Sequence, residues 1–177
     1  STHRGSSAAS DVYKRQRIDE ARAALRRFST TELIEIGAKA GEIFLNGEVE
    51  IGVMGEMQSP TQYVETLSST SGLPHVMVRR NMDKIHYALT NMQVVLNGLT
   101  RGIDPSILDA GVGEQFGTKV CFYPTSRALG LVMPSNSPAV NSLWLPAIAL
   151  KTPIVMKPGR DEPLTPYRLI QAFIQAG

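Results

Sequence analysis

The sequence predicts an α/β fold in which several helices come first and the start of a parallel sheet follows. Two observations carry this prediction. Apolar residues recur at helical spacing in the first part of the chain, most regularly from Val78 to Leu99. After Gly111 the pattern changes, and from Leu129 onward short apolar runs alternate with helical segments. Strands that alternate with helices favour parallel pairing, with the helices packed on the sheet.

Composition narrows the class of protein. The 177-residue chain has 42% hydrophobic and 19% charged residues, which is ordinary for a globular protein. Its apolar runs are far shorter than the ~18 residues that a membrane span needs. The single cysteine, Cys121, excludes an intramolecular disulfide, and no His, Asp or Glu cluster has metal-ligand spacing. We therefore expect a cytoplasmic protein without membrane contact and without a metal site.

The first sixteen residues differ in character from the rest. The segment Ser6–Gln16 back-translates to a transposase-type sequencing-library adapter, so we expect residues 1–16 to form a disordered tail without chemistry. This tail accounts for the whole formal net charge of +2, which leaves residues 17–177 with no net charge. No basic excess remains that would attract nucleic acid. We also expect both ends of the chain to be incomplete.

Residues 17–117 are predicted to be helical. The segment Arg17–Phe28 has a short helical pattern, and Ser29 stands three residues before Glu32, which is the spacing of a capping box. The helix that begins there ends at Asn46-Gly47, and Glu48–Gln58 is expected to be a loop.

Two further helices follow in the same part of the chain. Ser59-Pro60 begins a helix that runs to about Gly72, because proline suits the first helical position. The clearest pattern is the apolar stripe from Val78 to Leu99, which steps by four and three residues and predicts one helix of about six turns.

The remaining elements form a β segment and a β-α-β-α unit. Residues 118–128 hold a strand at Thr118–Pro124, in which Cys121 is expected to be a small buried residue. Residues 129–177 contain predicted strands and helices in alternation. The strands are Leu129–Met133 and Pro153–Met156, and the helices are Asn141–Leu150 and Tyr167–Ala176.

Candidate chemistry lies at the ends of the two predicted parallel strands. In open α/β sheets, ligands bind at the carboxyl ends of the strands. At the first end, Pro134 and Pro138 flank Asn136, whose amide can donate hydrogen bonds from a fixed position, as an oxyanion donor does. At the second end, Lys157 precedes a tight turn at Pro158-Gly159, and a lysine there can bind ribose hydroxyls or phosphate. A rigid turn and a solvated loop are the alternative interpretations of these two segments.

Taken together, these segments resemble the cofactor domain of the aldehyde dehydrogenase superfamily. The family pattern is Pro-Trp-Asn-Phe-Pro, a Pro-Ala-Leu helix, a strand that ends in Lys-Pro-Ser-Glu, and a helix that ends in Ala-Gly. The corresponding stretches here are PSNSP, PAIAL, IVMKPGRDEPLTP and QAG, all within about Leu129–Gly177. The strand at Thr118–Pro124 resembles the oligomerisation hairpin of this family.

The resemblance implies a fold, a reaction and a set of site residues. It implies the start of a Rossmann-like sheet that binds NAD or NADP, and a homo-oligomer in the full-length protein. The implied reaction is aldehyde oxidation through a cysteine thioester, with the nucleophile outside this chain and Cys121 not in that role. Asn136 is the implied oxyanion donor. The implied cofactor-binding residues are Met133, Pro134, Ser135, Lys157, Gly159 and Arg160.

Several departures from the family pattern leave the branch open. Ser135 and Ser137 replace the tryptophan and phenylalanine around the asparagine. Arg160 stands where a glutamate usually binds the adenosine ribose, which predicts tolerance of NADP. Leu150-Lys151-Thr152 is similar to the branch that transfers the acyl group to coenzyme A. A coenzyme-A-acylating enzyme and a non-catalytic binding module are therefore the alternatives to a hydrolytic aldehyde dehydrogenase.

Overall fold

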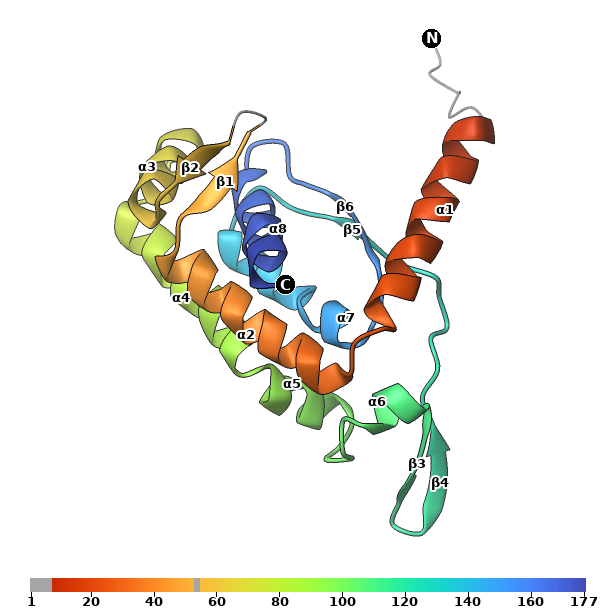
Figure 1. Cartoon of the computed structure of the whole chain (residues 1–177). Helices are drawn as coiled ribbons and strands as arrows, with labels where there is room; N and C mark the ends of the chain where they lie inside the picture. Colours follow the sequence, from red (N-terminus) through yellow and green to blue (C-terminus); the bar gives the residue numbers. More distant parts are fainter. Residues whose placement is uncertain (1–7, 53–54) are drawn as a thin grey trace.

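The protein combines helices with small two-stranded sheets. The computed structural model describes residues 8–52 and 55–177. Helices α2 (Thr30–Asn46) and α4 (His75–Thr90) run side by side, and α8 (Leu164–Ala176) packs against α2 (Figure 1). The sheets of the described part are β1–β2, β3–β4 and β5–β6, of which only the last is parallel. Helices and sheets are thus mixed, in agreement with the predicted α/β class.

The first helix, α1 (Ala8–Leu25), begins earlier than predicted. Residues 8–16, which the sequence assigned to a disordered tail, are its first turns, and residues 1–7 lie outside the described part. Figure 1 shows α1 standing away from the other helices. An ion pair between Asp19 and Arg127 connects it to the segment before β5 (Leu129–Val132). The predicted helix at Arg17–Phe28 ends at Leu25 and continues as a turn.

The next two helices begin where the sequence predicts. The Ser29 hydroxyl accepts the Glu32 N–H, and the Glu32 carboxylate accepts the Ser29 N–H at 2.7 Å, which completes the capping box of α2. These bonds lower the pKa of Glu32, because they favour its ionised form. The same arrangement of Ser59 and Gln62 begins α3 (Pro60–Ser71). Gly72 ends α3 with a left-handed backbone (φ 75°).

The segment between α2 and α3 is a hairpin, so the loop predicted for Glu48–Gln58 is wrong. Its strands are β1 (Val49–Ile51) and β2 (Glu56–Gln58), which pair in antiparallel register. Val49 and Gln58 are buried at the base of this hairpin. Two short strands separated by glycines carry too few residues for a visible alternation, which is why the sequence pattern missed them.

The long apolar stripe spans two helices rather than one. Helix α4 ends at Thr90 and α5 (Met92–Leu99) follows after Asn91. The Asn91 amide donates to the Tyr87 carbonyl at 2.9 Å, and the Thr90 hydroxyl donates to the His86 carbonyl at 3.0 Å. Such side-chain bonds to the backbone compete with the helical pattern and interrupt it. The stripe is nevertheless buried from Val78 to Leu96, whereas Leu99 is exposed.

A single core lies between α2, α3, α4, α8 and the short helices. Helix α2 approaches α4 closely because Gly41 has no side chain: a Cβ there would lie 3.0 Å from the Leu89 Cβ. At the rim of this contact, His86 Nε2 and Glu42 Oε1 are 2.6 Å apart, so the histidine links two helices. The hydrogen bond with His86 is the main reason that the pKa of Glu42 is lowered.

Of the β segment predicted at residues 118–128, only Thr118–Cys121 is a strand, and it is the second half of a hairpin; the predicted strand at Thr118–Pro124 thus ends three residues early. Helix α6 (Ile107–Ala110) leads into β3 (Val112–Gln115), which pairs with β4 (Thr118–Cys121). The two-residue turn between them, Phe116-Gly117, has positive φ at both positions. Because the hairpin projects from the body (Figure 1), Cys121 is exposed, and the prediction that it is buried is wrong.

The last part of the chain contains the predicted parallel pair. Strand β5 pairs with β6 (Ile154–Lys157), as expected. The predicted helix at Asn141–Leu150 is instead a 3₁₀ segment, η1 (Pro138–Leu143), followed by the short α7 (Pro146–Ala149). Pro146 explains the break, because it has no N–H for a continuing helix. Helix α8 begins at Leu164, three residues before the predicted start.

Candidate functional site

The carboxyl ends of β5 and β6 meet at one edge of the parallel pair. The register places Val132 beside Lys157, and the Met133 N–H donates to the Lys157 carbonyl at 2.9 Å. The loops that hold Asn136 and Arg160 therefore leave the sheet at the same edge. This is the juxtaposition that the sequence predicted for its two candidate segments.

The two loops also contact each other directly. The Asp161 N–H donates to the Ser135 hydroxyl at 3.1 Å. Gly159 is buried against the other loop, where a Cβ would lie 2.6 Å from Ser135 Oγ and 2.7 Å from the Pro134 carbonyl oxygen. Only glycine allows this approach without a shift of the backbone. Pro134, Ser135 and Gly159 thus fix the relative position of the loops.

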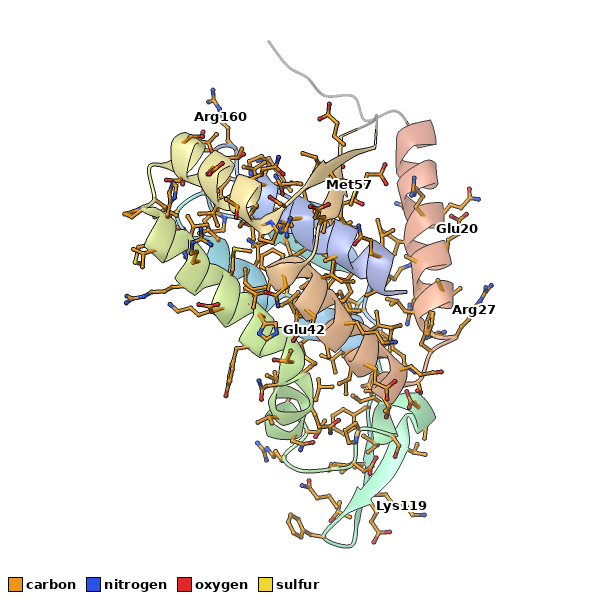
Figure 2. All side chains as sticks on the ribbon, turned by 60° about the vertical axis from the view of Figure 1, so that its left-hand side comes forward. Glu20, Arg27, Glu42, Met57, Lys119 and Arg160 are labelled. Atoms are coloured by element: carbon orange, nitrogen blue, oxygen red, sulfur yellow. The ribbon has the colours of Figure 1, made fainter. Side chains whose placement is uncertain are left out.

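Three of the predicted site residues present free side chains at this edge. Asn136, Lys157 and Arg160 are exposed, and within the described residues their side chains form no hydrogen bond or ion pair with another side chain. Figure 2 shows the Arg160 side chain projecting from the body into solvent. Met133 differs from the other predicted residues, because its side chain is buried in the core and only its backbone reaches the edge. The edge therefore carries two positive charges and one amide, with the exposed carboxylate of Asp161 beside them.

Glu162, beside this edge, is buried. Its Oε1 accepts hydrogen bonds from the Thr165 N–H at 2.8 Å and the Thr165 hydroxyl at 2.7 Å, and so it caps the start of α8. Burial raises the pKa of the Glu162 carboxyl, although the bonds from Thr165 oppose the shift. The Thr165 hydroxyl also lies 2.7 Å from the Tyr63 hydroxyl. Burial raises the pKa of Tyr63 as well. Of the two acidic residues after Arg160, only Asp161 is left at the surface.

Arg168 is a buried residue that the sequence analysis missed. Its guanidinium donates to the carbonyls of Phe44 at 3.0 Å, Gly47 at 2.7 Å and Gln58 at 3.0 Å. It lies over the rings of Phe44 and Tyr63, with 5.8 Å and 5.4 Å to their centroids. Burial lowers the pKa of Arg168 to about 10. Its helical spacing from Thr165 and Ala172 places it on the buried face of α8, and that spacing is the signal that could have identified it.

The structure contains neither a metal-ligand cluster nor a membrane helix in the part that it describes. Among the side chains that the structure describes, no three from His, Cys, Asp or Glu lie close enough to hold a metal ion. No described helix is both long and apolar enough to cross a membrane. In the comparisons with known proteins, no family model, no curated protein and no solved structure matches this chain.

Proposed function

We propose that this chain forms the start of the cofactor domain of an NAD(P)-dependent aldehyde dehydrogenase. The observation that carries the proposal is the parallel pair β5–β6 with its adjacent carboxyl ends. Asn136 lies on the loop after β5, Lys157 is the last residue of β6, and Arg160 lies on the loop that follows. Ligands of open α/β sheets bind at such an edge. The same segments carry the resemblance to that superfamily, and the proposal includes its Rossmann-like sheet.

The exposed residues at this edge fit a negatively charged dinucleotide. Lys157 and Arg160 would hold its adenosine ribose, and the contact of Gly159 with Pro134 and Ser135 fixes their loop against the loop that bears Asn136. A bound NAD(P) would supply the acceptor for the hydride that leaves the aldehyde carbon. The Asn136 amide would donate a hydrogen bond to the oxygen that becomes negative when a cysteine thiolate attacks the aldehyde. Cys121 is not that nucleophile in this proposal, because it lies on the projecting hairpin.

The charges at this edge favour NADP over NAD. A glutamate at the position of Arg160 would accept bonds from both ribose hydroxyls and repel a 2′-phosphate, whereas the guanidinium attracts the phosphate and can bind it with two parallel hydrogen bonds. Glu162 cannot take over as ribose acceptor, since it is buried and bonded to Thr165. Asp161 is the remaining acidic side chain near the site.

The test compares cofactors in the complete enzyme. We expect kcat/KM to be at least as high with NADP as with NAD, and Arg160→Glu to shift the ratio towards NAD. Arg80→Glu, on the exposed face of α4, is the control and should leave the ratio unchanged. A strong preference for NAD in the wild type that Arg160→Glu does not alter would remove Arg160 from the cofactor site.

A second arm tests the role of Asn136. In the complete enzyme, Asn136→Ala should lower kcat about a hundredfold or more with little change in the KM for the cofactor. Wild-type activity in this variant would assign Asn136 to a structural turn. Dependence of product release on coenzyme A would identify the acylating branch. Absence of any aldehyde oxidation or acyl reduction in the complete protein would favour a non-catalytic binding module.

A further inference from the structure

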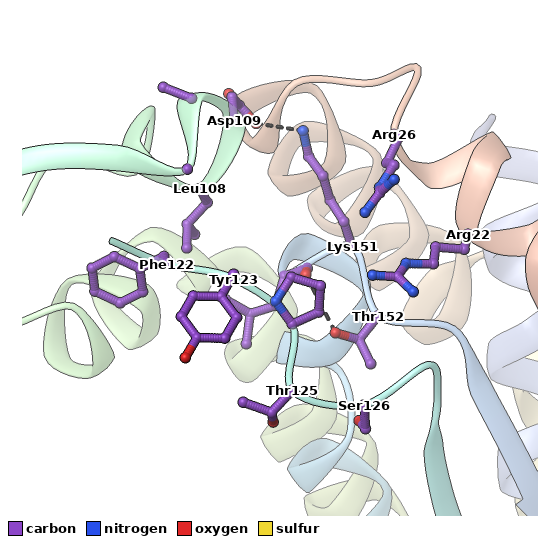
Figure 3. Close-up of a pocket in the computed structure, with 14 residues that line it drawn as sticks. Arg22, Arg26, Leu108, Asp109, Phe122, Tyr123, Thr125, Ser126, Lys151 and Thr152 are labelled. Carbon is purple, nitrogen blue, oxygen red and sulfur yellow. Dashed lines mark hydrogen bonds and ion pairs between the residues drawn. The ribbon is translucent and has the colours of Figure 1, made fainter. Parts of the chain in front are cut away.

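A second cluster of basic side chains lines a cavity away from the carboxyl ends of β5 and β6. The cavity has a volume of about 580 Å³ and lies between the end of α1, helix α6, residues 122–126 and the turn after α7 (Figure 3). Arg22, Arg26 and Lys151 form its basic side. Its other side chains include the aromatic rings of Phe122 and Tyr123 and the aliphatic hydroxyl groups of Thr125, Ser126 and Thr152.

The backbone holds Lys151 in an unusual conformation at this cavity. Its N–H donates to the Ile148 carbonyl at 2.9 Å, and the Thr152 N–H donates to the Ala147 carbonyl at 2.8 Å. These two bonds form a Schellman motif, in which the residue after the helix usually is a glycine with a left-handed backbone. Lys151 occupies that position here, with a φ of 55°. A lysine there is strained by about 1 kcal/mol relative to glycine. Lys151 is thus held with its ammonium group beside Asp109.

Asp109 neutralises only one of the three cations. Lys151 Nζ lies 2.5 Å from Asp109 Oδ1, which also accepts the Thr30 hydroxyl at 2.8 Å. Burial would raise the pKa of Asp109, but the bonds from Lys151 and Thr30 outweigh it and lower the pKa, so the carboxylate is ionised at neutral pH. In the part that the structure describes, the side chains of Arg22 and Arg26 have no ion pair or hydrogen bond. The charged lining residues therefore leave a net charge of +2.

From this geometry we infer that the cavity is a binding site for a small organic phosphate. Two free guanidinium groups four residues apart on one face of the chain match a dianionic phosphate, which each can bind with two hydrogen bonds. The Thr125 hydroxyl can donate to a further phosphate oxygen, whereas the Ser126 and Thr152 hydroxyls donate to the carbonyls of Ala128 and Leu150 at 3.3 Å and would have to turn away from them. Phe122 and the exposed ring of Tyr123 offer an apolar rim. The volume is within the range of small-ligand pockets. None of these residues belongs to the strand-end site, so this inference does not depend on the proposed function.

Phenyl phosphate is the probe that matches both parts of the cavity. In calorimetric titration of the full chain at low ionic strength, we expect saturable binding to the wild type. Arg22→Gln and Arg26→Gln should each weaken it about tenfold, because a charge-assisted hydrogen bond contributes at least that factor. Arg27→Gln removes the same charge from the next residue, which does not line the cavity and points away from the body (Figure 2). It should leave the affinity unchanged.

Two further measurements make the outcome specific. Arg22→Lys should recover part of the lost affinity, because the charge returns without the planar fork. Benzoate should bind more weakly than phenyl phosphate, because it carries one negative charge. The inference is overturned if the wild type shows no saturable binding, if benzoate binds equally well, or if Arg27→Gln weakens binding as much as Arg26→Gln. Circular dichroism and the melting temperature should be the same in all variants.

Discussion

Replacement of Arg168 by methionine should destabilise the protein by about 3 kcal/mol. Its guanidinium is fully buried and supplies the donors for the carbonyls of Phe44, Gly47 and Gln58. Phe44 lies in the last turn of α2, which has no basic residue of its own there, so Arg168 stabilises the negative end of that helix. Methionine fills a similar volume but leaves these carbonyls without their donor, and each orphaned buried group costs about 1–3 kcal/mol. Removal of a buried charge offsets part of this cost.

The assay for this prediction is urea unfolding followed by fluorescence. Trp144 is the single tryptophan and is buried, so its emission reports loss of the core. A loss of about 3 kcal/mol corresponds to a fall in Tm of about 6–12 °C for a chain of this size. Arg80→Met, on the exposed face of α4, is the matched control and should change stability by less than about 0.5 kcal/mol. An Arg168→Met variant as stable as this control would show that water or a shifted backbone satisfies the three carbonyls.

Three further predictions concern local structure. Glu162→Gln should stabilise the protein at neutral pH: the folded-state pKa of Glu162 is raised, so wild-type stability falls as pH rises through the window above its ordinary value. When unfolding is measured over a pH series, the free energies of unfolding of the wild type and the variant should converge below that window. A difference that does not change with pH would contradict a raised pKa of Glu162 in the folded protein. Ser29→Ala should cost about 1 kcal/mol through loss of the α2 cap, measured by urea unfolding, and an unchanged midpoint would refute the capping role. Gly159→Ala should cost about 1–3 kcal/mol because its Cβ meets the other loop, whereas Gly130→Ala has open space and is the control; equal Tm values would show that the loops move apart freely.

The sequence could predict those features that depend on neighbouring residues. The capping box at Ser29 joins groups three residues apart, so it is visible in the chain and is confirmed. The helix start at Ser59-Pro60 is confirmed as well, and the structure adds a capping box there. The parallel pair β5–β6 is also confirmed, because the alternation of apolar runs and helices favours parallel strands. From that pairing follows the meeting of the two strand ends. The roles of Asn136, Lys157 and Arg160 remain predictions.

Only the tertiary structure decided the features that join distant segments. The sequence pattern could not show that the helix ends at Thr90 and a second one begins at Met92, since the apolar stripe itself continues across the break. It also could not show that Cys121 is exposed, because that depends on where the hairpin projects. Arg168 donates hydrogen bonds to carbonyls that lie more than a hundred residues earlier in the chain. Lys151, after α7, forms an ion pair with Asp109 of α6. Which charged side chains are buried or paired depends on how the whole chain packs, so only the tertiary structure decides it. Helix caps and the alternation of strands and helices depend on the spacing of nearby residues, so the sequence by itself determines them.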